Sequence, residues 1–327
     1  MLHFLKNNQA ASIFFLPLLL ITIWIHGFIS PYPPEHPPGM LLYNFFLDAI
    51  INVHFLLPIA TMILVFSEAL LFNRIVTEHE IIKTTTYVPA TLYIILISCL
   101  PSFLTMHPIV IANLPLLFGL HKLMKTYRKK TAFSEVFDAG FFIAIASLIY
   151  FPSIVFVILI WIGLIIIRPF IWREWVISFM GFITPWIFFV FYYLWNNKID
   201  NLWHEIIFYT TGAPQKNLDI SAFTTPDIIT IGIIIVLGIL SIGNLFRNIS
   251  MGTVCTRNNI FLLIYFTILS ALSIFIAPSY SIKYFSFFAI PLAAFLPGYL
   301  LFIKKQWLAE TIFIFFLLSI IFNQIAG

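Results

Sequence analysis

Residues 153–167 read SIVFVILIWIGLIII, an uncharged stretch in which apolar side chains follow one another without a polar residue at every second position. A strand of a membrane barrel would alternate apolar and polar residues over ~10 positions. A helix that crosses a bilayer core ~30 Å thick instead needs ~20 predominantly apolar residues in succession. This stretch therefore predicts a membrane-spanning helix.

The composition extends this interpretation from one stretch to the whole chain. Of the 327 residues, 61% are hydrophobic and 9% are charged, and the mean hydropathy is +1.03. Soluble domains carry ~25% charged residues, so the composition excludes a soluble globular protein. We expect an all-α, multi-pass bundle of transmembrane helices that forms a single transmembrane domain over residues 1–327.

Eleven apolar segments are interpreted as spans. They lie at about 11–30, 50–72, 88–106, 107–124, 136–151, 152–168, 174–195, 228–246, 259–277, 282–303 and 306–325. The first segment follows Lys6 and lacks the small-x-small cleavage site of a secretory signal, so we expect it to remain as a helix. The segment 136–151 is short, and Asp138 near its start is a residue type that favours the beginning of a helix.

The basic residues indicate how these segments are oriented. With a cytoplasmic N-terminus, fourteen of the seventeen fall in inner loops: Lys6, Arg74, Lys83, Lys122, Lys125, Arg128, Lys129, Lys130, Arg168, Arg173, Arg247, Arg257, Lys304 and Lys305. Lys198, Lys216 and Lys283 fall outside. Because short cytoplasmic loops are enriched in lysine and arginine, this distribution predicts an inner N-terminus and, after eleven spans, an outer C-terminus.

Two inner segments contribute most of this basic character. The inner loop 121–135 is interpreted as a topology anchor that contacts anionic lipids, and a nucleic-acid site so close to a bilayer is not expected. The segment RPFIWREW, residues 168–175, predicts an interfacial belt of arginine and tryptophan side chains.

Two predicted outer loops are long, residues 31–49 and 196–227, and both are acidic. In the second loop, apolar residues recur at three-to-four spacing from Ile199 to Ile207 and include Trp203. This spacing is typical of a short helix that lies in the membrane interface, which we expect at about 199–209.

The first outer loop contains SPYPPEHPP, residues 30–38, whose prolines favour an extended backbone around Glu35. Downstream, Asn44, Asp48 and Asn52 share one face of a predicted helix. The simplest interpretation is that the prolines end the first helix. Alternatively, Glu35 or Asp48 is a catalytic carboxylate presented at the membrane surface, or the loop binds a partner protein.

Two ionisable residues fall inside the second predicted span, His54 near its outer end and Glu68 near its inner end. Ionisable groups inside a span are candidate functional residues because burying them in lipid is costly. His54 and Glu68 are therefore candidates for a pore or a proton relay. A packed histidine, and a glutamate that reaches interfacial water, are the simpler alternatives.

Lys283 and Tyr280 lie in PSYSIKYFSF, residues 278–287, where serine and tyrosine hydroxyls surround one cation. A cation with hydroxyl groups at the headgroup level suits a lipid phosphate, so we predict a lipid-phosphate site at these two residues. An ordinary interfacial lysine is the alternative.

Motifs that would name a chemistry are missing from the sequence. It contains no phosphate loop, no dinucleotide-binding glycine pattern, no metal-ligand spacing and no nucleophile with its base. Cys99 and Cys255 form neither a disulfide framework nor a metal cluster. We therefore predict no metal site, and the cofactor remains open.

The block 113–190 resembles a family of uncharacterised bacterial multi-pass inner-membrane proteins. The matching features are FDAGF, YFP, RPF followed by WREW, and the glycine and proline that come next. The resemblance extends over most of the chain. It implies a bacterial inner-membrane location and brings no activity with it.

The predicted architecture is similar to that of the GT-C type membrane glycosyltransferases, which use polyprenyl-phosphate sugars. Those proteins have a cytoplasmic N-terminus, about eleven spans and a first outer loop with an acidic catalytic residue before a short interfacial stretch. The resemblance implies that Glu35 or Asp48 is the base and that Lys283 contacts the lipid phosphate.

Three functions remain open from the sequence. The first is a glycosyltransferase-like enzyme that acts on lipid-linked substrates at the outer face, with membrane lipids and a polyprenyl-phosphate lipid as partners. The second is a non-catalytic membrane subunit of an envelope assembly or secretion complex, with a protein partner. The third is a transporter, which would depend on polar groups such as Asn113 and His54.

The orientation can be tested by cysteine labelling from outside the cell in a background without Cys99 and Cys255. Ser30→Cys and Asn217→Cys should react with a membrane-impermeant maleimide, and Thr126→Cys should not, because the first two positions are predicted outside. The reverse pattern would contradict the predicted orientation.

Overall fold

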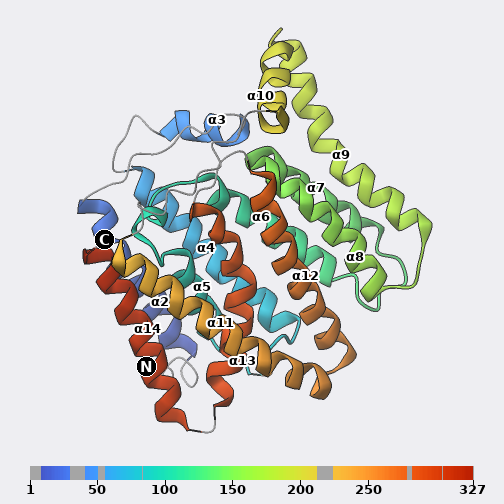
Figure 1. Ribbon diagram of the computed structural model, residues 1–327. Helices are drawn as coiled ribbons and strands as arrows, with labels where there is room; N and C mark the ends of the chain where they lie inside the picture. Colours follow the sequence, from blue (N-terminus) through green and yellow to red (C-terminus); the bar gives the residue numbers. More distant parts are fainter. Residues whose placement is uncertain are drawn as a thin grey trace.

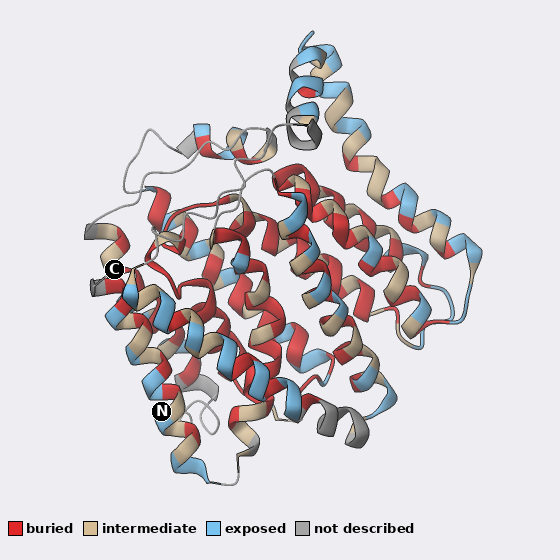
Figure 2. Ribbon diagram, in the orientation of Figure 1, coloured by how far each residue is buried: buried red, intermediate tan, exposed pale blue. Residues whose placement is uncertain are grey.

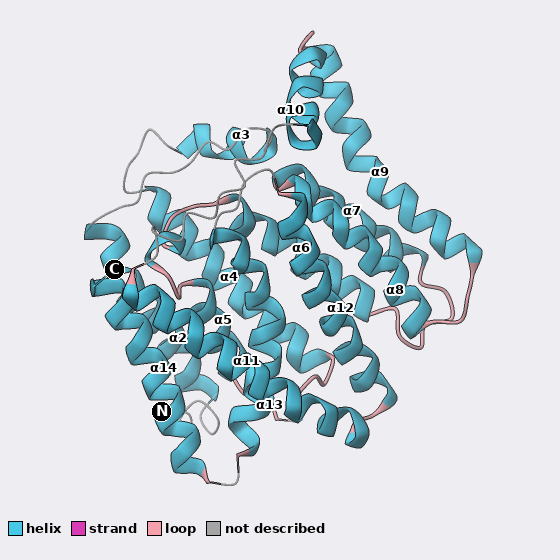
Figure 3. Ribbon diagram, in the orientation of Figure 1, coloured by secondary structure: helices cyan, strands magenta, loops and turns pink. Residues whose placement is uncertain are grey.

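The computed structural model describes residues 9–29, 41–50, 56–82, 84–211, 224–277, 282–303 and 305–326, and every element within them is a helix (Figure 3). In chain order these are α2 (Gln9–Ile29), α3 (Leu41–Ile50), α4 (Leu56–Glu78), α5 (Val88–Ile97), η1 (Pro101–Phe103), α6 (Pro108–Met124), α7 (Phe133–Ile149), η2 (Phe151–Phe156), α8 (Val157–Ile167), α9 (Trp172–Trp195), α10 (Ile199–Thr211), α11 (Thr225–Met251), α12 (Val254–Ile276), η4 (Ile282–Phe288), α13 (Ala289–Phe302) and α14 (Gln306–Ala326). The η elements are 3-10 helices.

The helices coincide with the predicted apolar segments. Each of the eleven segments falls on an α-helix or on a 3-10 helix and an α-helix together. By length and composition, six helices among the described residues can cross a membrane, and four shorter apolar helices accompany them. These observations confirm an all-helical protein with several membrane-capable helices. The number of crossings and the orientation of the termini stay predictions.

One helix start differs from the sequence prediction. α7 begins at Phe133 with Glu135 in its first turn, so the prediction that Asp138 marks a helix start was wrong. Asp138 instead lies in the second turn, where its Oδ2 accepts a hydrogen bond from Lys122 Nζ at 2.7 Å. The ion pair with α6 explains a carboxylate at this position.

Two short helices lie outside the main bundle. α3 runs across the ends of the bundle helices, and α10 projects beyond them at the end of α9 (Figure 1). The predicted helix in the second long loop is confirmed, and it extends from Ile199 to Thr211. Leu202 of α10 is buried, whereas Trp203 and Ile207 are exposed. The exposed apolar side chains fit the predicted contact of α10 with the membrane interface.

α7 lies between α6 and α9 in close packing that depends on glycine. A Cβ atom on Gly140 of α7 would collide with the carbonyl oxygen of Ser178 in α9, and one on Gly181 of α9 would collide with the carbonyl oxygen of Phe137. Small residues let membrane helices approach until their backbones touch. The buried residues, red in Figure 2, are concentrated in the centre of the bundle, and exposed residues follow α9, α11 and α14.

One end of the bundle is defined by contacts beneath α3. Trp24 Nε1 donates to Ser98 Oγ at 2.9 Å, and Gln324 Nε2 donates to the Ser98 carbonyl oxygen at 2.8 Å. The Tyr43 hydroxyl of α3 donates to the Met106 carbonyl oxygen at 2.9 Å. These bonds join the last turns of α2 and α14 to the α5–α6 connection, and we call this end the α3 end. α2 and α14 therefore run in the same direction.

The opposite end collects the described parts of the predicted inner loops. Arg168 Nη1 donates to the Thr126 carbonyl oxygen at 2.7 Å, and Asn258 Nδ2 donates to the Ile166 carbonyl oxygen at 3.1 Å. These bonds join the segments that follow α6 and α8 to the start of α12. We call this the basic end. Thr126 is itself buried, so the exposed Lys130 is the better labelling position at this end.

The position of α10 can be tested by limited proteolysis of the protein in proteoliposomes. Trp203→Glu should raise cleavage within residues 196–211, because a charge replaces the aromatic side chain expected in the interface. Trp203→Phe keeps an aromatic ring and should leave cleavage near the wild-type rate. Equal cleavage of the wild type and Trp203→Glu would contradict an interfacial α10.

Candidate functional site

Lys283 lies at the α3 end in η4, a 3-10 helix in which residues three apart share a face. Ile282, Phe285 and Phe288 form one face, which lines an apolar groove. Lys283 and Ser286 fall on another face and are buried, with exposures of 9% and 0%. η4 therefore turns a cation and a hydroxyl into the protein while its apolar side chains line the groove.

His107 connects η4 to the start of α6. Its Nδ1 lies 3.0 Å from the Thr105 carbonyl oxygen, and its Nε2 lies 3.2 Å from Ser286 Oγ. A carbonyl oxygen only accepts, so Nδ1 carries the proton and Nε2 of the neutral ring accepts from the Ser286 hydroxyl. Lys283 is the charged neighbour of this ring. The bond between His107 and Ser286 fixes η4 and thereby positions the Lys283 side chain.

Aromatic rings pack against η4 from the side of α7. Tyr150 lies just beyond the end of α7, with its ring 5.6 Å from that of Tyr284 and 5.4 Å from that of Phe287. Phe287 also packs against Phe156 of η2 at 5.5 Å. The segment that carries Lys283 is therefore held by a hydrogen bond on one side and by ring packing on another.

The groove on the apolar face of η4 has a volume of about 930 Å³. α11 forms one wall, from Ile228 to Leu245, and residues of α5, α12 and α13 form the other. Binding sites for small molecules range over roughly 300–1,000 Å³. Because almost every lining residue is apolar and the walls are membrane-capable helices, a hydrocarbon chain is the ligand that suits this groove.

The structure places some of the predicted site residues and leaves others outside its description. Asp48 is exposed on α3, which is fixed at the α3 end by Tyr43. Tyr43 of α3 bonds the Met106 carbonyl, and the next residue, His107, contacts Ser286 of η4. Asp48 on α3 and Lys283 on η4 therefore lie at the same end of the bundle. Glu35, His54 and Tyr280 lie outside the described residues.

Glu68 is fully buried, so the expectation that it reaches interfacial water was wrong. Its Oε2 accepts a hydrogen bond from the Tyr93 hydroxyl of α5 at 3.0 Å. Its Oε1 makes no hydrogen bond of standard geometry within the described part of the chain, and the backbone of Leu114 in α6 also interacts with the carboxylate. Asn113 of α6 lies beside the Tyr93 hydroxyl, and neither atom of its amide makes a hydrogen bond of standard geometry there. Three helices thus enclose a polar cluster with unused hydrogen-bonding capacity.

The expected arginine and tryptophan belt at 168–175 is only partly present. Arg173 and Trp172 are exposed, with the guanidinium carbon 5.9 Å from the ring centre. Arg168 is buried instead, and its Nε and Nη2 each lie 2.9 Å from an oxygen of Glu174. Glu174 also accepts from the Ala132 amide, so this ion pair ties the α8–α9 connection to the loop before α7.

Two groups of side chains were missed by sequence reasoning. His107 and Ser286 are 179 residues apart, and no local pattern joins them. At the basic end, Glu78, His79 and His121 bring three potential ligand atoms within 4.8 Å of one another. The pair Glu78–His79 in TEHE was the available signal, but its partner His121 lies on a different helix.

Comparison with known proteins adds a family and no activity. No curated protein and no solved structure matches the chain. Residues 39–326 match a family of unknown function, DUF6427. The matched range includes every helix described above except α2. On this match the chain belongs to the DUF6427 family, in agreement with the resemblance to an uncharacterised family that the sequence itself suggested.

Proposed function

We propose that this protein binds a lipid-linked phosphate at the α3 end of the bundle and acts there as a transferase that uses polyprenyl-phosphate sugars. The observation that carries the proposal is that η4 has a charged face and an apolar face. One short segment presents a buried cation on one face and lines a hydrocarbon-sized groove with the other.

A lipid-linked phosphate combines the two chemistries that η4 offers. An ammonium group binds phosphate oxygens by charge-assisted hydrogen bonds, which are the stronger class of hydrogen bond. The Ser286 hydroxyl donates to His107 instead and holds η4 in place. The isoprenoid chain of such a lipid is apolar and needs a lateral groove between helices. Lys283 and the groove beside α11 supply both within one segment.

The reacting groups in this proposal come from α3 and the loop before it. A transferase needs a base near the acceptor hydroxyl, and a carboxylate at the membrane surface suits that role. Asp48 is exposed on α3 at the same end as Lys283. Glu35 is the second candidate from the sequence. The short surface helices α3 and α10 support the likeness to glycosyltransferases in which an acidic outer loop precedes an interfacial stretch.

Binding is tested with the full-length protein in detergent and a short-chain polyprenyl phosphate as the probe. Lys283→Met should raise the dissociation constant roughly ten- to a hundredfold, because a hydrogen bond to a charged group contributes ~1.5–3 kcal/mol. Lys198→Met removes an exposed lysine after α9 and should leave binding unchanged. Equal affinity for polyprenyl phosphate in the wild type and Lys283→Met would contradict the proposal, and so would equal affinity of the wild type for the uncharged polyprenol.

The transfer step is separated from binding by changing the carboxylates. Glu35→Gln and Asp48→Asn combined should keep phosphate binding and abolish sugar transfer from a polyprenyl-phosphate donor. If transfer persists in the double variant, neither carboxylate is the base. If the wild type binds the lipid but transfers nothing and co-purifies with another membrane protein, the subunit alternative replaces the enzyme.

A second candidate function rests on the buried Glu68. An ionisable residue enclosed by α4, α5 and α6 with an unused oxygen is the feature expected of a proton or ion pathway. This observation favours the transporter alternative, in which Glu68, Tyr93 and Asn113 form the central part of the path.

Under this second candidate, proteoliposomes with a pH-sensitive dye inside should show proton flux through the wild type. Glu68→Gln keeps the shape of the side chain and removes its ability to release a proton, so flux should fall to the level of empty vesicles. Asp200→Asn on the exposed face of α10 is the control and should conduct like the wild type. Flux retained in Glu68→Gln would exclude Glu68 from any pathway.

A further inference from the structure

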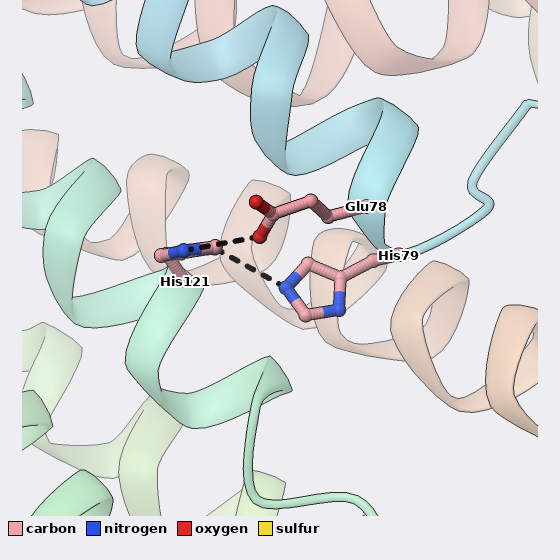
Figure 4. A group of neighbouring side chains, drawn as sticks. All are labelled: Glu78, His79 and His121. Atoms are coloured by element: carbon pink, nitrogen blue, oxygen red, sulfur yellow. Dashed lines mark hydrogen bonds and ion pairs between the residues drawn. The ribbon is translucent and has the colours of Figure 1, made fainter. Parts of the chain in front are cut away.

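We propose that Glu78, His79 and His121 form a divalent metal site of the zinc type at the basic end, with a fourth coordination position open to solvent. Figure 4 shows the three side chains directed toward one another from the end of α4 and the last turn of α6. The site is separate from Lys283 and from the function proposed above.

The end of α4 brings two adjacent residues to one site. Glu80 adopts a positive φ of 49°, the Ile81 amide donates to the Val76 carbonyl at 3.1 Å, and the Glu80 amide donates to the Thr77 carbonyl at 3.3 Å. This pair of bonds is the Schellman motif that ends a helix with a left-handed residue. The motif ends α4 just after Glu78: the His79 amide still donates to the Ile75 carbonyl at 3.1 Å, and the chain turns away from the helix at Glu80. The side chains of Glu78 and His79 both reach His121.

The distances suit a small cation. His79 Nε2 lies 3.2 Å from His121 Nδ1, and His121 Nε2 lies 3.4 Å from Glu78 Oε2. Zinc binds histidine nitrogen and carboxylate oxygen at ~2.0–2.2 Å in a tetrahedral arrangement, which separates neighbouring ligand atoms by roughly 3.3 Å. The two contacts use opposite nitrogens of the His121 ring, and one ligand atom from each residue lies within 4.8 Å of the others. The His121 ring would therefore turn, and the ligand atoms move closer together, when a metal binds.

The environment supplies the remaining features of a metal site. Both histidines are buried, and imidazole nitrogens are common metal ligands. The His79 carbonyl accepts from Asn259 Nδ2 of α12 at 3.3 Å, which fixes the backbone of this ligand. Glu78 is exposed, so water can reach the fourth position.

Two cations compete with a metal for Glu78. Arg74 Nε donates to its Oε1 at 2.7 Å, and Lys125 Nζ lies 3.7 Å from its Oε2. Both basic side chains are well exposed and can withdraw into solvent. Removing Arg74 should therefore strengthen metal binding, which is an effect that damage to the fold would not produce.

The test uses the untagged full-length protein in detergent, stripped with a chelator and titrated with Zn²⁺ against a chromogenic competitor. We expect one Zn²⁺ per chain, and Co²⁺ should give the visible absorption of a tetrahedral site. His79→Gln, His121→Gln and Glu78→Gln should each weaken Zn²⁺ binding roughly tenfold or more. Arg74→Gln should tighten it several-fold.

Three controls make the result specific. His204→Gln changes an exposed histidine on α10, and Cys255→Ser removes a thiol that lies near Asn259, and neither should alter the Zn²⁺ affinity. Lys283→Met should also retain full Zn²⁺ binding, so this site and the lipid-phosphate proposal can fail independently. Substoichiometric Zn²⁺ in the wild type would overturn the proposal, and so would affinities that are equal in the wild type and the three ligand variants. The histidine pair would then be a structural hydrogen bond.

Discussion

Lipid supplies no hydrogen bonds, and this constraint accounts for where the chain places its buried polar side chains. Trp24, His107 and Arg168 all lie near helix ends, where connecting segments provide carbonyl and hydroxyl partners. Arg168 uses most of its hydrogen-bond donors. Its guanidinium contacts both oxygens of Glu174 and also donates to two loop carbonyls. Glu68 is different, since it lies in the middle of a helix and one of its oxygens makes no hydrogen bond of standard geometry in the described chain.

The positions of the helices could be predicted because apolarity is a local property of each segment. The segment 306–325, for example, matches α14 to within one residue at its end. The start of α7 was misplaced because a lone Asp138 was taken for a helix-start residue, whereas it forms an ion pair with Lys122 of the preceding helix. The burial of Arg168 could not be predicted either, because its partners Thr126 and Lys130 are about forty residues away in sequence.

The candidate sites also combine features that the local sequence shows with contacts between distant segments that it does not. Lys283 could be identified from the hydroxyls around it in sequence, but the residue that positions its segment, His107, comes from the other half of the chain. The assembly of Glu78 and His79 with His121 depends on how α4 ends and how α6 packs beside it, and no spacing rule in the sequence contains that geometry. Asp48 and Lys283 were predicted on one face, and the helix contacts place both at the α3 end.

The crossing of α7 and α9 has a mechanical consequence. α9 has few buried residues, and its backbone touches that of α7 where Gly140 meets Ser178 and Gly181 meets Phe137. α10 continues from the far end of α9, beyond the bundle (Figure 1). A bulkier side chain at either glycine would push α9 away from α7, because the two backbones touch there. Since α10 follows directly on α9, such a shift would also displace α10 relative to the bundle.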